Sequence, residues 1–331
     1  MRILVLGGTA FLGRAFAVAA LARGHEVTCL ARGTQGGPPE GASHVVADRT
    51  SPTAYDDVVG ESWDAALDIG THPGFVRSAV DALATSVDRY LYVSTVSVYT
   101  DDSVPGADED AAVHEPLVAD ELGSMEEYGS AKVACEHAVR AKFGPDRSLI
   151  ARAGLIGGPG DRSGRTGYWP WRFAHPATAD GSVLVPEDDA AMAALIDVRD
   201  LAEWLVLCAE RGTHGTFNAM ANCRPFAEHL AAAREVAGHD GPLARATAEW
   251  LEEHGVGIWM GPKSLPLWLP GEEYAGHATR STARAEAAGL SPRPLTDTLT
   301  DVLTWEETQD QPHGSGLSDD EERDLVARAR A

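Results

Sequence analysis

The chain has 331 residues, of which 44% are hydrophobic and 23% are charged, so it can form a substantial globular core. Its formal net charge of -23 argues against nucleic acid or an anionic membrane as a partner, and no apolar run is long enough to cross a bilayer. The four cysteines form no C-x-x-C and the twelve histidines show no metal-ligand spacing. We therefore expect free thiols, no metal site and a cytoplasmic protein.

The chain begins with a pattern typical of strand, glycine turn and helix. The apolar run at 3–6 predicts a buried strand, a helix follows the glycines to about residue 23, and 26–30 predicts a second strand. Such a turn points unpaired N–H groups and the positive end of a helix at a pyrophosphate. The unit therefore predicts a dinucleotide site formed by Gly7, Thr9, Ala10, Phe11, Leu12 and Gly13.

Strands and helices alternate through the rest of the first half. We expect strands at 44–47, 63–67, 89–94 and 148–152, helices at 75–86 and 128–142, and a polar loop at 101–122. Buried parallel strands are largely apolar, as these are. The alternation predicts an α/β fold with a Rossmann-type, doubly wound parallel sheet.

The sequence pattern changes in the second half of the chain. We expect loops over a pocket at 157–161 and 168–172, a helix at 197–207, a last strand at 216–219 and mainly helices from about 225. A linker at 309–316 then leads to a capping box, Ser318 to Glu321, that starts a final helix. We assign 1–165 to an NADP(H)-binding domain, to which 196–222 returns. Residues 166–195 and 223–331 are assigned to a smaller, mostly helical substrate-binding region.

The end of the second strand indicates which dinucleotide binds. NAD-binding units carry Asp or Glu there, whereas this strand ends Ala31-Arg32. A guanidinium suits a 2′-phosphate, which a carboxylate would repel. Arg32 and the missing carboxylate therefore favour NADP(H) over NAD(H).

A tyrosine and a lysine lie at i and i+4 on one predicted helix. Tyr128 and Lys132 share a helix face, and the chain has only three lysines in all. A lysine charge at about 5 Å, with an effective dielectric of about 20, would contribute about 3 kcal/mol and lower the phenol pKa by about two units. This pair predicts general acid/base chemistry.

Together these motifs resemble the short-chain dehydrogenase/reductase superfamily, in its extended, NAD-dependent epimerase/dehydratase-like branch, as a divergent reductase-like subgroup. The resemblance covers about 1–220. It implies that Thr95 hydrogen-bonds the reacting oxygen, that Tyr128 exchanges the proton and that Lys132 holds the nicotinamide ribose and tunes the tyrosine. It also implies that Asp48 contacts adenine. The further cofactor contacts that it implies are Ile69, Gly70, Val93, Leu155 and Ile156.

The chain differs from that branch at several positions, and these differences narrow the range of possible substrates. Ala10 replaces a glycine, Val96 and Ser97 replace the acidic pair of dehydratases, and Leu155 replaces the asparagine of sugar-nucleotide enzymes. Aromatic residues instead suggest a planar, apolar pocket. The expected substrate contacts are Ser97, Tyr168, Trp169 and Trp171, with Trp259 and Trp268 as further candidates.

These observations favour an NADPH-dependent reductase acting on the ketone of a medium or large, aromatic or polycyclic small molecule. One alternative is a sugar-nucleotide epimerase, which uses the same residues and holds its oxidised cofactor through turnover. Another is a non-catalytic, NADP-responsive regulator, against which the Tyr128 and Lys132 pair argues. We expect a monomer or a homodimer.

Overall fold

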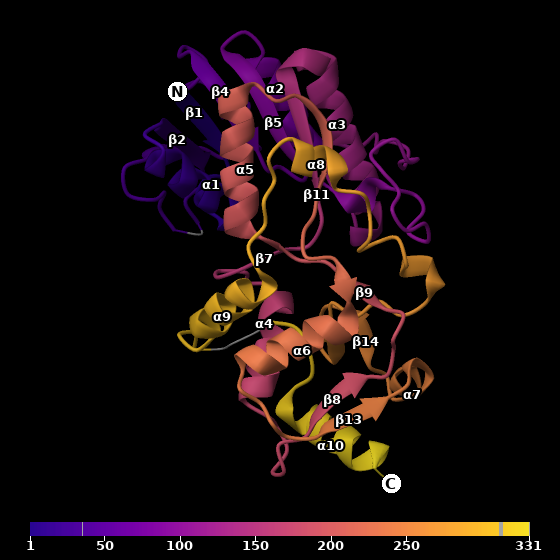
Figure 1. Cartoon of the computed structure of the whole chain (residues 1–331). Helices are drawn as coiled ribbons and strands as arrows, with labels where there is room; N and C mark the ends of the chain where they lie inside the picture. Colours follow the sequence, from indigo (N-terminus) through magenta and orange to yellow (C-terminus); the bar gives the residue numbers. More distant parts are fainter. Residues whose placement is uncertain (35, 311–313, 331) are drawn as a thin grey trace.

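The computed structural model describes residues 1–34, 36–310 and 314–330, and contains one seven-stranded sheet (Figure 1). All strand pairs in it are parallel, in the order β11-β6-β5-β4-β1-β2-β3. The strands are β1 (Arg2–Leu6), β2 (Glu26–Ala31), β3 (Ser43–Val46), β4 (Trp63–Asp68), β5 (Val87–Thr95), β6 (Ser148–Ala153) and β11 (Gly215–Ala219). The predicted Rossmann-type fold is confirmed.

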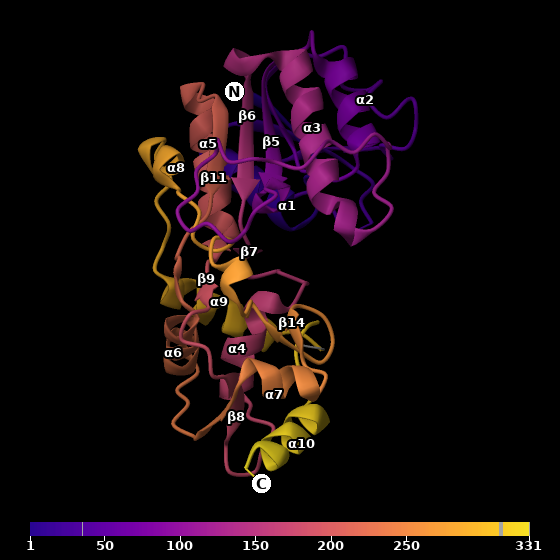
Figure 2. The same cartoon turned by 90° about the vertical axis from the view of Figure 1, so that its right-hand side faces the viewer.

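Helices cover both faces of this sheet. One face packs against α1 (Phe11–Ala22) and α5 (Val198–Arg211), and the other against α2 (Pro73–Leu83) and α3 (Tyr128–Phe143). Figure 2 shows α5 on one side of the strands and α2 and α3 on the other. The apolar strands are buried from both sides, which explains their near-continuous hydrophobic sequence. We call this part the sheet lobe.

The chain adds strands first on one side of β1, as β2 and β3, and then on its other side, from β4 onward, so the strand order reverses between β1 and β4. Connections leave the sheet in opposite directions at such a point, so a crevice forms at the carboxyl ends of the strands. The glycine turn after β1, the segment after β4 and the end of β5 all reach this edge. The fold thus brings together the segments that carry the predicted site.

The remaining elements form a second body, the C-terminal lobe, around its own apolar core (Figure 1). Its helices are α4 (Arg165–Ala174), α6 (Phe226–Val236), α7 (Ala248–Glu253), α9 (Leu295–Glu306) and α10 (Asp319–Ala329). Its strands are β8 (Val183–Pro186), β9 (Met192–Ala193), β12 (Arg224–Pro225), β13 (Leu243–Ala246), β14 (Gly257–Trp259) and β15 (Ser264–Pro266). The chain after residue 225 therefore contains more strand than its sequence suggests.

Two short strands, one short helix and four single-turn 3-10 helices complete the described part of the chain; the 3-10 helices are η1 (Val96–Val98), η2 (Met125–Glu127), η3 (Pro145–Arg147) and η4 (Glu272–Tyr274). The strands β7 (Ile156–Gly157) and β10 (Ile196–Asp197) pair where the chain passes between the lobes. The helix α8 (Ala283–Ala287) lies near β11, on the sheet lobe (Figure 1). Within the three described ranges, no helix combines the length and apolar character needed to cross a membrane.

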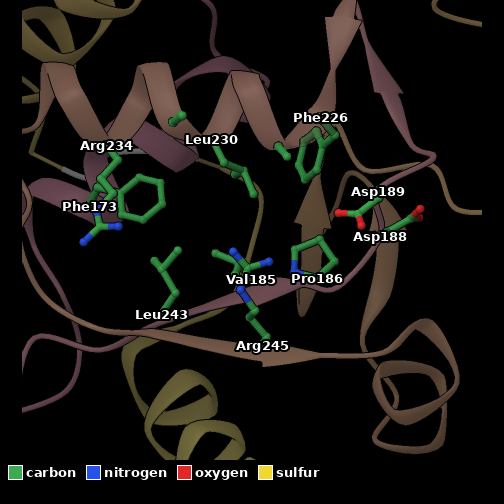
Figure 3. Close-up of a pocket in the computed structure, with 12 residues that line it drawn as sticks. Phe173, Val185, Pro186, Asp188, Asp189, Phe226, Leu230, Arg234, Leu243 and Arg245 are labelled. Atoms are coloured by element: carbon green, nitrogen blue, oxygen red, sulfur yellow. The ribbon is translucent and has the colours of Figure 1, made fainter.

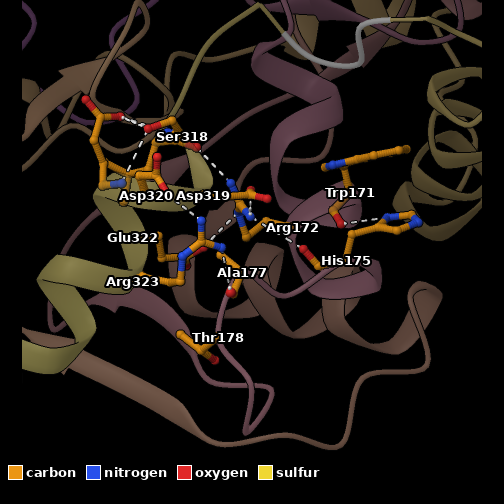
Figure 4. A network of polar contacts seen from close by, with 12 residues as sticks. Trp171, Arg172, His175, Ala177, Thr178, Ser318, Asp319, Asp320, Glu322 and Arg323 are labelled. Carbon is orange, nitrogen blue, oxygen red and sulfur yellow. Dashed lines mark hydrogen bonds and ion pairs between the residues drawn. The ribbon is translucent and has the colours of Figure 1, made fainter.

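The end of the chain is packed against the C-terminal lobe. The predicted capping box is present: Ser318 accepts from the backbone N–H of Glu321, whose carboxylate accepts from the backbone N–H of Ser318. In Figure 4, α10 lies beside α4, and ion pairs join Arg172 of α4 to Asp319 and Glu322 of α10. Of the predicted linker at 309–316, residues 311–313 lie outside the described part.

Candidate active site

The glycine turn is shaped by close backbone approach. A Cβ on Gly13 would lie 2.3 Å from the carbonyl oxygen of Gly7, and one on Gly8 would lie 2.4 Å from Sγ of Cys29. Gly7 has a φ of +104°, a conformation that favours glycine. Ala10 has an extended backbone, with φ -118° and ψ 156°, so this position does not require the glycine that the family usually places there.

The first turn of α1 is open to an external anion. Ala10 precedes the helix without a side-chain cap, and the first intrahelical bond is donated by the N–H of Arg14 to the Ala10 carbonyl. The N–H groups of Phe11, Leu12 and Gly13 therefore point out of the helix end. Together with the helix dipole they fit a dinucleotide pyrophosphate.

Two hollows meet around this helix end. A groove of about 1130 Å³ is lined by Thr9, Ala10 and Phe11 together with residues of α5 and α9. A cavity of about 540 Å³, which we call the catalytic cavity, lies at the ends of β4, β5 and β6. The predicted site residues that line it are Ala10, Phe11, Leu12, Ile69, Val93, Thr95, Ser97, Tyr128, Lys132, Leu155 and Ile156.

The predicted catalytic hydroxyl groups lie together in the catalytic cavity. Thr95 ends β5, and its Oγ1 donates to Oγ of Ser97 at 3.2 Å and accepts from the Ser97 N–H at 3.2 Å. Tyr128 opens α3 and hydrogen-bonds Thr95. Burial raises the pKa of the Tyr128 phenol, against the opposing effects of Thr95 and of the Arg165 charge. The phenol is therefore protonated at neutral pH and can act as an acid.

Lys132 is held by backbone carbonyls one helical turn along α3. Its Nζ donates to Gly70 O at 2.9 Å and to Val93 O at 2.6 Å, which leaves one of its three protons for another acceptor. Burial lowers the pKa of Lys132 to about 8. The expectation that Lys132 lowers the pKa of Tyr128 is wrong, because burial dominates and the cation that opposes it is Arg165.

Arg32 and Asp48 lie apart from the catalytic cavity, at the ends of β2 and β3. These strands are neighbours, and both side chains are exposed. Asp48 accepts from the N–H and the hydroxyl of Thr50 at 3.0 and 2.8 Å, and these bonds, with a smaller effect of Arg32, hold its pKa below the usual range. Their position suits the adenosine end of an extended dinucleotide.

The predicted aromatic substrate pocket at 168–172 is wrong. This segment lies inside α4, and Tyr168 and Trp169 are completely buried in the core of the C-terminal lobe. Nε1 of Trp169 donates to Pro266 O at 2.7 Å. Trp171 stacks on His175 with ring centroids 3.9 Å apart (Figure 4). Of the predicted substrate contacts, only Ser97 and the further candidate Trp259 line the catalytic cavity; Trp268 is buried elsewhere.

Other residues complete the substrate side of the catalytic cavity. They are Met125, Asp161, Arg165, Met260 and His277. Asp161 and Arg165 are four residues apart, and the others come from segments distant in the sequence, so no single local motif marks the set. Another cavity, of about 220 Å³, lies below α6 in the C-terminal lobe, between Phe173, Phe226 and Arg245 (Figure 3). It contains none of the predicted site residues.

Comparisons with known proteins show the family and the fold of the chain. A family model for the NAD dependent epimerase/dehydratase family matches residues 3–219. No curated protein sequence matches the chain. A solved UDP-glucose 4-epimerase is 17% identical, with 95% of this chain and 99% of that chain covered and a TM-score of 0.68.

Two further solved structures share the fold. WbmH from Bordetella bronchiseptica, in complex with NAD+, is 14% identical, with 94% of this chain and 99% of that chain covered and a TM-score of 0.68. UDP-glucuronic acid 4-epimerase from Bacillus cereus, in complex with NAD, is 14% identical, with 92% and 98% covered and a TM-score of 0.62.

Proposed function

Because the chain belongs to the NAD-dependent epimerase/dehydratase family, we propose that it is an NADP(H)-dependent reductase of a small-molecule ketone, with Tyr128 as the proton donor. The observation that carries this proposal is the meeting of Thr95, Tyr128 and Lys132 in one cavity with residues of the glycine turn. When bound, the nicotinamide cofactor supplies the hydride. The chain supplies position, polarisation and a proton.

The roles of the side chains follow from their protonation and contacts. Tyr128 holds its proton at neutral pH and releases it to an oxygen that gains negative charge, while the nearby Thr95 hydroxyl donates to the same oxygen. The remaining Lys132 proton is available to a ribose hydroxyl. Because the phenol is protonated, these groups support reduction of a carbonyl better than oxidation of an alcohol.

The exposed Arg32 supports NADP(H) as the cofactor. Within the described ranges, Arg32 makes no ion pair, so its guanidinium is available to a 2′-phosphate. Arg32 follows the last residue of β2, where NAD-binding units place a carboxylate.

The second candidate is an NAD(P)-dependent epimerase. The names of the similar solved structures favour it, since they include UDP-glucose and UDP-glucuronic acid 4-epimerases. The segment after Thr95 argues against a dehydratase, because Val96 is buried and Ser97 carries no carboxylate. The non-catalytic regulator is disfavoured because the predicted catalytic groups share a cavity.

The test is consumption of NADPH with a panel of ketones, followed by nicotinamide absorbance. We expect turnover, and we expect Tyr128→Phe to reduce kcat by about 10²- to 10⁴-fold without weakening NADPH binding, because only the proton donor is lost. Tyr274→Phe, outside the catalytic cavity, is the matched control. Undiminished turnover by Tyr128→Phe would refute the proposed role. Tightly bound NAD(P)+ in the purified protein, without net NADPH consumption, would instead support the epimerase.

A further inference from the structure

The catalytic cavity contains a cation that the proposed reaction does not use. Arg165 is the first residue of α4, and it lines this cavity together with Tyr128. Its Nε donates to Oγ of Ser163 at 3.1 Å, and its guanidinium carbon lies 5.3 Å from the ring centroid of Trp259. These two contacts fix the plane of the guanidinium group on the substrate side of the cavity.

No carboxylate within the described ranges is paired with Arg165. Asp161 is close enough to raise the Arg165 pKa, but its Oδ1 accepts from the Ser163 N–H at 2.9 Å and its Oδ2 from the Thr166 hydroxyl at 2.8 Å. Burial outweighs this effect and lowers the pKa of Arg165. The two Nη groups have no hydrogen-bond acceptor in the described part of the chain.

Arg165 is half-buried, and other half-buried or buried arginines of this chain show what is missing there. Arg49 pairs with Asp68 at 2.7 Å, Arg152 with Glu136 at 2.9 Å, and Arg172 with Glu322 at 2.9 Å. Buried charges are normally paired in this way. The Nη edge of Arg165 can therefore receive two oxygens of one external anion, in the forked geometry that guanidinium groups favour.

Part of the cavity wall near Arg165 is apolar, beside the polar groups of Asp161 and Ser163. Trp259 covers one side of the guanidinium, and Met125 and Met260 line the same cavity with 71% and 49% of their surfaces exposed. Single exposed apolar side chains are common on protein surfaces, but these two line the same cavity and could cover the apolar part of one ligand. The wall thus offers a planar contact, two flexible thioethers and one cation to a single ligand.

We propose that Arg165 binds a carboxylate or phosphate group of the substrate, so that the substrate is an anionic carbonyl compound whose apolar part packs on Trp259, Met125 and Met260. This inference rests on the proposed function of the same cavity, and it adds the charge of the substrate. An anion at Arg165 also offsets the positive charge that favours ionisation of Tyr128, so binding keeps the phenol protonated for its step as an acid.

The experiment measures binding apart from turnover. The probes are para-acetylbenzoate, its uncharged methyl ester and para-acetylphenyl phosphate. Each is titrated calorimetrically into the NADPH-loaded Tyr128→Phe variant, whose turnover is expected to be slow enough for binding to be measured. We expect the anions to bind about 10- to 100-fold more tightly than the ester. The difference between carboxylate and phosphate identifies which anion the site prefers.

The same titrations are then made with Arg165 replaced in the Tyr128→Phe background. Arg165→Gln should remove the preference for the anions and leave ester binding unchanged, and Arg165→Ala should do the same. Arg211→Ala is the matched control, because Arg211 is exposed and lines neither the catalytic cavity nor the groove beside α1. A thermal unfolding curve confirms that each variant is folded.

Two results would overturn the inference. One is equal affinity of the parent protein for acid and ester, and the other is an anion affinity that Arg165→Gln and Arg165→Ala leave unchanged. Reduction of neutral ketones without any preference for acids would sink the inference while the reductase proposal stands. If the wild-type protein binds the acids through Arg165 but does not reduce them, the anion site is supported and the reductase proposal fails.

Discussion

We predict that a single side chain, Arg32, decides the preference for NADPH over NADH. It is exposed beyond β2 and makes no ion pair in the described part of the chain. A hydrogen bond to a charged group contributes about 1.5–3 kcal/mol, so Arg32→Ala should raise KM for NADPH by about 10- to 100-fold. NADH lacks the 2′-phosphate and serves as the internal control, with KM expected to change little. A variant that retains its NADPH preference would show that Arg32 does not read the phosphate.

The protonation of Lys132 should set the alkaline limit of activity. Its pKa is lowered to about 8 by burial, so the ammonium form is present below that pH and is lost as the pH rises through it. Each further pH unit then removes about nine-tenths of the remaining ammonium. We expect kcat/KM for NADPH-dependent reduction to fall about tenfold per pH unit above this value.

The pH–rate profile of Lys132→Arg checks this assignment. A guanidinium stays charged throughout the alkaline range, so the decline should disappear or move to much higher pH, although the absolute rate will be lower. A decline at the same pH in both proteins would assign it to another group.

At the residue scale, the sequence predicted the groups of the site that are encoded locally. Tyr128 and Lys132 lie on one helix turn, and Thr95 ends an obvious strand. Trp259 was named only as a further candidate, and Arg165 was missed, because the two residues are 94 positions apart in the chain and only tertiary packing brings them into contact. Tyr168 and Trp169 show the opposite error, because they were predicted to contact the substrate and are core residues instead. Aromatic side chains occur both in buried cores and in ligand pockets, so their residue type does not distinguish the two.

The element on which cofactor binding depends most is the glycine turn with α1. At Gly13 a Cβ would meet backbone atoms of Gly7 and Gly8 at 2.3 to 3.1 Å, and backbone cannot rotate away as a side chain can. Gly13→Ala should therefore displace the N-terminus of α1, lower the stability by about 1–3 kcal/mol and weaken NADPH binding at least tenfold. Fluorescence titration with NADPH and thermal unfolding measure the two effects.

Ala10→Gly is the matched control in the same turn. Ala10 has an ordinary extended backbone, so glycine should fit there and cost at most about 1 kcal/mol through added freedom of the unfolded chain. If both variants bind NADPH as the parent protein does, the close approach of Gly13 to Gly7 is not what shapes the pyrophosphate site.

Helices and strands were predicted accurately where their own sequence strongly favours one type of secondary structure. The strands of the sheet were predicted within a few residues because most of them are largely apolar. The helix α4 was mistaken for a loop because it contains Gly167 and Pro170, which are unfavourable inside helices. It forms because its aromatic side chains are buried against the rest of the lobe, a contribution that local propensity does not include.

At the scale of the whole molecule, the catalytic cavity is built from both lobes. The sheet lobe provides Thr95, Tyr128 and Lys132, and the C-terminal lobe provides Arg165 and Trp259. On the side of the C-terminal lobe, the segment before α10 connects two parts of the cavity wall. Oγ of Ser315 donates to Ser163 O at 2.7 Å and accepts from the N–H of Gly261 at 3.3 Å. The position of the substrate wall therefore depends on the docked end of the chain.

The docking of α10 depends in turn on a buried ion pair. Oε2 of Glu322 lies 2.9 Å from Nε of Arg172, and its Oε1 accepts from the N–H of Leu184 at 2.9 Å. Both charged side chains are almost completely buried. Removal of Glu322 leaves the buried Arg172 with only the exposed Asp319 as its ion-pair partner, and leaves the N–H of Leu184 without its acceptor. A broken buried pair typically costs about 3–5 kcal/mol, whereas an exposed pair contributes little.

Glu322→Ala should therefore lower the Tm by several degrees and loosen the segment that holds Ser163 and Gly261. We expect KM for the carbonyl substrate to rise while the affinity for NADPH is unchanged, because the glycine turn belongs to the sheet lobe. Asp324→Ala is the matched control, since Asp324 lies on the same helix and forms an exposed pair with Arg328. Calorimetric unfolding, steady-state kinetics and NADPH titration separate these effects. An unchanged Tm, or a loss of NADPH affinity that parallels the rise in KM, would contradict the view that α10 supports only the substrate wall.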